Sequence, residues 1–238
     1  MRNALPPEPT MTADQLKKIF PNAEPAALAQ TTQELGTAPA LYGLDSPLKL
    51  AHFFAQVRQE SGADFSAQVE GLNYKASVLQ STFAYYAARK DEAVADARLN
   101  DPVTGKLLRP ANQQAIANKA YAKRNGNGDI ASGDGFRFRG RGFLQVTGRD
   151  NYAANTQRYR LVYPDKATDF VADPTLLERF PFSLRSAVCY WLINGLDKKA
   201  AMGSSGDDVD RITRVINSKT DSFAERRANF VIAFNALR

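Results

Sequence analysis

Residues 46–74, SPLKLAHFFAQVRQESGADFSAQVEGLNY, are the stretch of sequence that decides the fold. Ser46 is a favourable N-cap, and Pro47 suits the first helical position, where a missing N–H costs nothing. Apolar residues then recur at spacings of three and four, which is typical of a helix with one face in a core. They are Leu50, Phe53, Phe54 and Val57. We expect this helix to end near Gly62 and to carry Glu60 in its last turn.

A second carboxylate, Glu70, follows ten positions after Glu60, past a short loop that contains Phe65. Two carboxyl groups, one protonated and one ionised, are what the hydrolysis of a glycosidic bond requires. Burial beside Phe53, Phe54 and Phe65 would keep Glu60 protonated, whereas a better solvated Glu70 would stay ionised. The pair alone fits two ordinary surface residues, at a helix end and in a loop, better than a catalytic pair, so the hypothesis needs a further pattern.

That pattern lies in residues 136–152, FRFRGRGFLQVTGRDNY. The run RGRGFLQVTG at 139–148 resembles the GRG-x-x-Q-[LI]-[TS] signature of family 19 glycoside hydrolases, the chitinases of plants and bacteria and their bacteriophage endolysin relatives. Further segments match the family in the same order: ESG at 60–62, NY at 73–74, NGNGD at 125–129, IN at 216–217 and FAER at 223–226. The resemblance covers residues 11–237 and fits the phage endolysin branch best, because the cysteine framework of plant chitinases is missing.

The resemblance implies a mainly α, lysozyme-like helical domain with a minor extended or β element. It also implies an inverting mechanism in which Glu60 is the general acid, Glu70 the general base, and Thr147 holds the attacking water. The carboxyl groups of an inverting site should stand about 6.5–9.5 Å apart. The substrate-binding residues that it implies are Gln145, Asn151, Tyr74, Asn217 and Arg226. By the family's example we expect a monomer with no cofactor and no metal.

Two departures from the family pattern concern the surroundings of these residues. Many relatives have a histidine immediately before the catalytic glutamate, where this chain has Gln59, and two glycines after the late Ile-Asn, where Ser218 and Lys219 follow Asn217. Neither departure removes a carboxylate. Because the chemistry needs a fixed acid and base, we also expect Arg139 or Arg141 to orient one of the glutamates and keep it ionised.

The composition excludes several other chemistries. One cysteine, Cys189, excludes an intramolecular disulfide, and its apolar neighbours predict a buried, inert thiol. One histidine, His52, excludes a His-rich metal site and a conventional Ser-His-Asp triad. His52 lies off the apolar stripe of its helix, and we expect it to have a structural or surface role.

The net charge of +6 favours an anionic partner. No helix-turn-helix, zinc-finger or RNA-binding signature is evident, so we do not expect that partner to be nucleic acid. An anionic bacterial wall would attract the chain, and the basic last helix suggests a transient contact with the outer membrane. No run of about eighteen apolar residues and no signal peptide is found, so we expect the protein to stay in the host cytoplasm until it is released to the periplasm and cell wall.

The remaining sequence predicts further helices at 12–20, 24–35, 76–83, 112–124, 151–159, 182–192, 208–217 and 222–237. Residues 1–10, MRNALPPEPT, predict a flexible leader ahead of a single catalytic domain at 11–238.

Residues 91–106 are expected to form a solvated insertion, residues 125–135 a flexible lip of the cleft, and the GRG run a short ribbon. Tyr85, Tyr86 and Trp191 are interpreted as core rather than sugar-stacking residues. Arg226 and Arg227 are expected opposite or oblique to the apolar face of the last helix.

The function predicted from these observations is that of an endolysin that hydrolyses β-1,4 glycosidic bonds of bacterial peptidoglycan and lyses the host cell. Two alternatives remain at this point. A chitinase acting on N-acetylglucosamine polymers would be separated by which polymer yields soluble sugar. A catalytically inactive wall-binding protein would keep its biological effect after Glu60→Gln.

Overall fold

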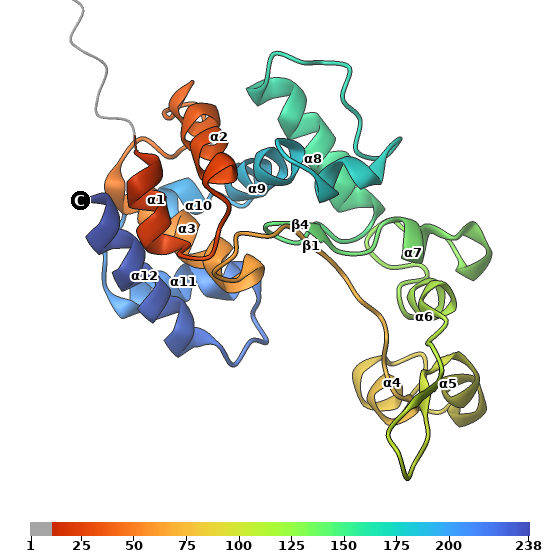
Figure 1. Cartoon of the computed structure of the whole chain (residues 1–238). Coiled ribbons are helices and arrows are strands. Elements are labelled where there is room, and N and C mark those ends of the chain that lie inside the picture. The colour runs from red at the N-terminus through yellow and green to blue at the C-terminus, as the bar shows by residue number, and fades with distance from the viewer. Residues whose placement is uncertain (1–10) are drawn as a thin grey trace, which may run out of the picture.

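A computed structural model describes residues 11–238, and the leader expected at residues 1–10 lies outside the described residues. Helices dominate the chain, and four short strands pair into two antiparallel two-stranded sheets (Figure 1). The mainly α class with a minor β element is therefore confirmed. None of the helices within residues 11–238 combines the length and apolar character that crossing a membrane would take.

Two groups of buried apolar side chains divide the molecule into a large lobe and a small lobe. The large lobe contains α1 (Ala13–Ile19), α2 (Pro25–Gly36), α3 (Pro47–Ser61), α8 (Arg149–Val162), η2 (Pro174–Glu178), α9 (Phe182–Ile193), α10 (Leu196–Ala200), α11 (Gly206–Ile216) and α12 (Phe223–Leu237). The small lobe contains α4 (Ala76–Thr82), α5 (Lys90–Asp96), β2 (Leu99–Asn100), β3 (Leu107–Arg109) and α6 (Gln113–Ala120). Its core forms from residues 72–120, so the small lobe is an insertion within the large one (Figure 1).

The connection between the lobes carries a two-stranded sheet. Strand β1 (Gln68–Val69) leads out of the large lobe, and β4 (Arg141–Gly142) belongs to the returning chain, after η1 (Ile130–Ser132) and α7 (Asp134–Arg137). The strands are antiparallel, with Gln68 opposite Gly142 and Val69 opposite Arg141. The short ribbon expected from the GRG run is confirmed. The pairing of its two strands determines which residues beyond the strand ends lie close together.

Helix α3 forms as its sequence predicts. The Ser46 side chain accepts a hydrogen bond from the Lys49 N–H, Pro47 begins the helix, and Gly62 ends it at φ +77°. Phe53 and Phe54 are fully buried in the large core. Helix α12 packs along α3, and Gln59, at the position where many family members have histidine, accepts a hydrogen bond from Asn229 of α12 at 3.0 Å.

His52 lies in α3 and is fully buried, which makes its role structural rather than one at the surface. Its Nε2 lies 2.9 Å from the Gly203 carbonyl oxygen, and its ring lies 4.3 Å from that of Phe230. Burial lowers the pKa of His52, an effect that the Gly203 carbonyl only partly opposes.

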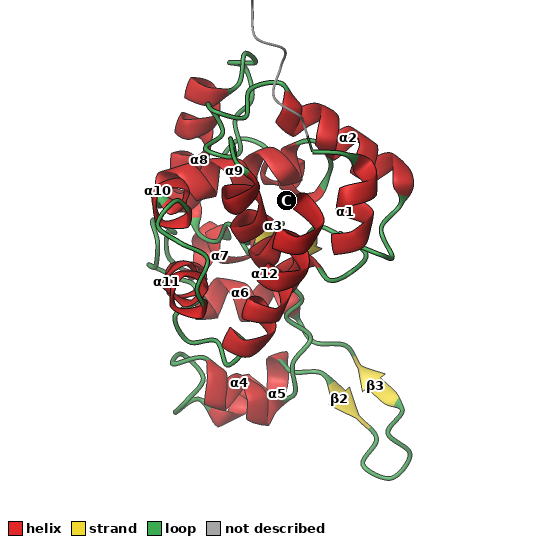
Figure 2. Ribbon diagram, turned by 90° about the vertical axis from the view of Figure 1, so that its left-hand side faces the viewer, coloured by secondary structure: helices red, strands yellow, loops and turns green. Residues whose placement is uncertain are grey.

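The region expected as a solvated insertion, residues 91–106, has more structure than the sequence indicated. It includes most of α5 and the start of a hairpin, β2–β3, that projects from the small lobe (Figure 2). Asp96 of α5 is buried and accepts hydrogen bonds from Tyr86 at 2.8 Å and Lys119 at 2.7 Å. The core interpretation of Tyr86 and Trp191 is confirmed, since both are fully buried.

Candidate active site

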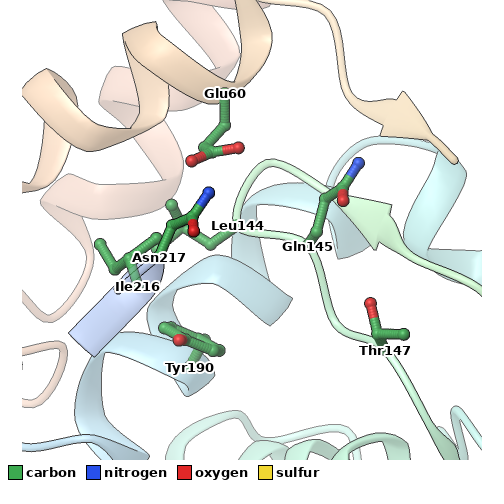
Figure 3. A pocket seen from close by; sticks show the side chains of 7 residues that line it. All are labelled: Glu60, Leu144, Gln145, Thr147, Tyr190, Ile216 and Asn217. Atoms are coloured by element: carbon green, nitrogen blue, oxygen red, sulfur yellow. The ribbon is translucent and has the colours of Figure 1, made fainter. Parts of the chain in front are cut away.

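A cavity of about 200 Å³ opens at the end of α3, and Glu60 lines it (Figure 3). The other lining side chains come from the segment after β4, from α9 and from the end of α11. They are Leu144, Gln145, Thr147, Tyr190, Ile216 and Asn217. Five of the seven lining side chains, Glu60 included, carry polar groups, and a cavity with converging hydrogen-bonding groups suits a polar ligand such as a sugar.

Glu60 is held by an arginine from the opposite end of the chain. Arg226 Nη2 donates a hydrogen bond to Glu60 Oε1 at 2.5 Å, and Arg226 Nη1 donates to Gln56 Oε1 at 2.6 Å. The Arg226 side chain is only 3% exposed, so its expected position away from the apolar face of the last helix is wrong. Arg226 lies behind the carboxylate and does not line the cavity.

The apolar surroundings expected for Glu60 are also wrong. Phe53, Phe54 and Phe65 point into the large core and are buried there, while 22% of the Glu60 side chain is exposed. Its hydrogen-bond partner is the Arg226 guanidinium, which comes from α12. Glu60 therefore lies between a guanidinium and the opening of the cavity rather than in an apolar pocket.

Tyr190 is a cavity residue that the sequence did not single out. Burial, and after it the negative charge of Glu60, raises the pKa of Tyr190, so its phenol stays protonated at neutral pH. The hydroxyl donates to the Val215 carbonyl oxygen at 3.3 Å. Tyr190 and Ile216 lie in the helices predicted at 182–192 and 208–217, and nothing in their local pattern distinguishes a core position from the wall of a cavity.

Glu70 lies immediately after β1, where the sheet fixes its backbone. Its N–H donates to the Gly140 carbonyl oxygen at 2.8 Å, and in return the Gly140 N–H donates to Glu70 Oε2 at 3.0 Å. The other carboxylate oxygen, Oε1, accepts a hydrogen bond from the hydroxyl of Tyr121. Both oxygens of Glu70 therefore accept a hydrogen bond, and the two donors fix the orientation of the carboxylate.

The expectation that Arg139 or Arg141 orients a glutamate of the site is wrong. Arg141 Nε binds Glu178 at 2.6 Å, and its Nη1 donates to the Arg137 carbonyl oxygen at 2.8 Å. Arg139 donates to the Phe136 carbonyl oxygen, and its guanidinium lies 3.9 Å from the centre of the Phe136 ring. The hydrogen bond from the GRG segment to Glu70 comes from the backbone of Gly140, and neither arginine donates one to Glu60 or Glu70.

Gly140 brings Glu70, Gln145 and Thr147 together. A Cβ added at Gly140 would lie 2.9 Å from Gln145 Oε1 and 3.1 Å from Thr147 Oγ1, so both side chains pack against this glycine. The N–H of the same residue binds Glu70. Glycine is needed here because any side chain would displace two polar groups of the site.

The other candidate residues surround this centre. Asn217 caps the C-terminal end of α11 and lines the cavity, where Figure 3 shows its amide near the Glu60 carboxylate. Tyr74 is half-buried against Phe83, and burial together with the charge of Glu70 raises its pKa. Asn151 does not line the cavity; its Nδ2 donates to the Thr147 carbonyl oxygen at 2.7 Å and so supports the segment that carries Thr147.

The loop expected as a flexible lip, residues 125–135, is largely structured. Asp134 is buried and accepts hydrogen bonds from the Gly128 N–H at 2.9 Å and from Arg149 at 3.3 Å. Within the part of the chain that the structure describes, no group of three or more His, Cys, Asp or Glu side chains is placed to hold a metal ion.

Comparison with known proteins identifies a close relation for nearly the whole chain, although no family model matches it. A protein of Haemophilus influenzae described as a glycosyl hydrolase family 19 domain-containing protein is 33% identical over 210 residues. The aligned residues cover 88% of this chain and 88% of that protein.

Proposed function

The chain belongs to glycoside hydrolase family 19, and from that membership we propose that it is a bacteriophage-type endolysin that hydrolyses the β-1,4 glycosidic bonds of bacterial peptidoglycan. The cavity at the end of α3 supports this proposal most directly. Its polar side chains gather around one carboxylate, Glu60, and a second carboxylate, Glu70, is bound to the glycine against which Gln145 and Thr147 pack.

In the proposed mechanism Glu60 donates a proton to the glycosidic oxygen as the bond to the anomeric carbon breaks. Glu70 accepts a proton from a water molecule that attacks the opposite face of the sugar ring, and the Thr147 hydroxyl orients that water. The two donors on Glu70 support its assignment as the base, because they hold its carboxylate in one orientation toward the site. Glu60 lines the cavity, so its carboxyl group can reach the glycosidic oxygen of a bound sugar, as the assignment of Glu60 as the acid requires.

Charge supports peptidoglycan over chitin as the substrate. The chain carries a net charge of +6, and an anionic wall attracts such a protein whereas neutral chitin does not. The side-chain amides of Gln145 and Asn217 suit the acetamido groups that both polymers share. In the proposed role a monomer passes from the host cytoplasm to the wall and makes only transient contact with the anionic outer membrane.

The test is the loss of turbidity of Gram-negative cells stripped of their outer membrane, with the unaltered protein beside Glu60→Gln. Glu225→Gln is the matched control, because it makes the same chemical change on an exposed face of α12. Lysis that is lost in Glu60→Gln and retained in Glu225→Gln is the expected result, with a loss of about 10²–10⁴-fold. Equal lysis by all three proteins would remove Glu60 from the mechanism.

Two further measurements separate the alternatives. Soluble sugar released from chitin oligomers, without lysis of cells, would establish a chitinase instead. The anomeric configuration of the first product, followed by NMR, reports the stereochemistry, and inversion is expected. Retention would contradict the acid–base assignment, because it requires a carboxylate to attack the sugar directly.

A further inference from the structure

The Glu70 carboxylate is bonded to both lobes of the molecule. Oε2 accepts from the N–H of Gly140, which lies between Phe138 and Phe143 of the large core. Oε1 accepts from the hydroxyl of Tyr121, the residue that ends α6 of the small lobe. The position of the Glu70 side chain thus depends on both lobes, each of which has its own core.

Tyr121 is itself held firmly by the small lobe. Its ring meets that of Phe83 edge-on at 6.0 Å, and its carbonyl oxygen accepts a hydrogen bond from Asn127 at 3.0 Å. Burial, and after it the negative charge of Glu70, raises the pKa of Tyr121 far above neutral pH. The phenol therefore keeps its proton and donates it to the carboxylate.

We propose that Tyr121 is the positioning residue of the general base: its hydroxyl and the Gly140 N–H fix the two oxygens of Glu70, so that the orientation of the base depends on how the two lobes are placed. This inference rests on the proposed function, in which Glu70 deprotonates the attacking water. A misplaced base is costly, because proton abstraction requires hydrogen-bond geometry with that water.

Glu70 needs such a clamp because of where it lies in the chain. It follows a strand of two residues and is not part of a helix or strand, so local structure does not restrict its side chain. One hydrogen bond leaves a carboxylate free to rotate about that bond, whereas donors on both oxygens define its plane. The donor from Gly140 comes from the residue before β4, and the second donor, Tyr121, comes from the small lobe.

The charged and titratable groups that face Glu70 are few. They are Tyr74 and Tyr121 from the small lobe and Arg139 from the segment before β4, while Arg124 lies near Tyr121. Of these, Tyr121 is the one that donates a hydrogen bond to the carboxylate. Removing its hydroxyl changes the stabilisation of the ionised base without removing a charge.

The experiment compares Tyr121→Phe with Tyr86→Phe. Tyr86 is buried in the same lobe and donates to Asp96, so its substitution matches the loss of a buried hydroxyl without touching Glu70. For Tyr121→Phe we expect kcat to fall about tenfold with KM changed less than twofold, since one charge-assisted hydrogen bond is lost. We also expect the acid limb of the pH–kcat profile to move to higher pH, because the ionised carboxylate loses a donor. Tyr86→Phe should leave both quantities unchanged.

A double-substitution cycle distinguishes positioning from a general structural effect. In a Glu70→Gln background, Tyr121→Phe should cause no further loss, because the hydroxyl acts through the carboxylate that is no longer there. The same tenfold loss in both backgrounds would overturn the proposal. An unchanged kcat and pH profile in Tyr121→Phe would overturn it as well.

A measurement without substrate separates this inference from the proposed function. NMR titration of the Glu70 side-chain carboxyl should give a higher midpoint in Tyr121→Phe than in the unaltered protein and no change in Tyr86→Phe. An unchanged midpoint overturns the positioning role even if the enzyme is active. If the unaltered protein cleaves neither polymer, the proposed function fails, while the titration still decides whether Tyr121 controls Glu70.

Discussion

Arg226 of α12 binds Glu60 of α3 through Nη2 and Oε1, 2.5 Å apart, across 166 positions of sequence. The same guanidinium binds Gln56 one helical turn earlier, and its Nε donates to Ser222 at 3.1 Å. The orientation of the carboxylate in the cavity is therefore set by the docking of the last helix on α3.

Replacement of Arg226 should affect both stability and catalysis. Arg226→Ala leaves Gln56 and Glu60 without their buried donor, and we expect it to lower the free energy of unfolding by about 3 kcal/mol. This value is at the low end of the cost of breaking a buried ion pair, because Glu60 is partly exposed. Arg226→Lys should fold but lose activity, since an ammonium cannot replace the guanidinium fork. Urea unfolding and turbidity assays measure the two effects. Arg227→Ala, at an exposed neighbour, should cost less than about 1 kcal/mol, and an equal cost at both positions would contradict this account.

Gly140→Ala should damage the site while sparing the fold. The added methyl group would lie within 3.1 Å of both Gln145 Oε1 and Thr147 Oγ1, and these side chains can move only by leaving their places in the site. We expect lysis to slow by up to about 100-fold, the cost of a displacement of about 1 Å in a catalytic group. Gly71→Ala is the control, because a methyl group there meets no atom within 4 Å. Equal activity of the two variants would show that the close contacts at Gly140 are without consequence.

The burial of His52 makes stability depend on pH. The pKa of His52 is lowered in the folded protein, whereas in the unfolded chain it has its ordinary value of about 6.5. Below that pH the unfolded chain therefore binds a proton more readily than the folded protein does. The free energy of unfolding should therefore have its full value above about pH 6.5. Below that pH it should fall by up to about 1.4 kcal/mol for each unit by which the pH is lowered. Denaturant titrations at several pH values measure this slope. Since His52 is the only histidine, His52→Gln should reduce the slope in that range, and parallel curves would contradict the assignment.

Cys189 should be unreactive in the folded protein. Burial raises the pKa of its thiol to about 12, so almost no thiolate forms at pH 8. We expect labelling by an aromatic disulfide reagent to be slow in buffer and rapid in denaturant. Because the chain has one cysteine, the absorbance of the released group reports this site alone. Rapid labelling in buffer would mean that the core around α9 opens readily.

The parts of the fold that were predictable are those that local sequence decides. The mainly helical, lysozyme-like class is confirmed, and the cap at Ser46, the end of α3 at Gly62 and the ribbon at the GRG run all form where expected. Caps, glycine turns and apolar periodicity act over a few residues, so a sequence displays them directly. The segments that form α5 and the β2–β3 hairpin are polar and carry none of these signals. These elements were therefore not predicted.

Part of the lining of the cavity was predictable from the sequence, but the contacts of the two glutamates were not. The resemblance selected Glu60, Gln145, Thr147 and Asn217, and all four line one cavity. The partners of the glutamates come from far along the chain: Tyr121 from α6, Gly140 as a backbone donor, and Arg226 from α12. Periodicity places a residue on a face of its own helix and says nothing about which distant element covers that face. The arginines of the GRG segment were chosen for their charge, whereas the bond to Glu70 comes from an N–H that every residue but proline has.

The packing of α12 on α3 has a consequence for synthesis in the cell. The core of the small lobe comes from one continuous segment, whereas the core of the large lobe includes residues of the last helix. Until α12 emerges, Glu60 lacks the hydrogen bond from Arg226. We therefore expect the orientation of Glu60 to be fixed only when translation has reached the end of α12.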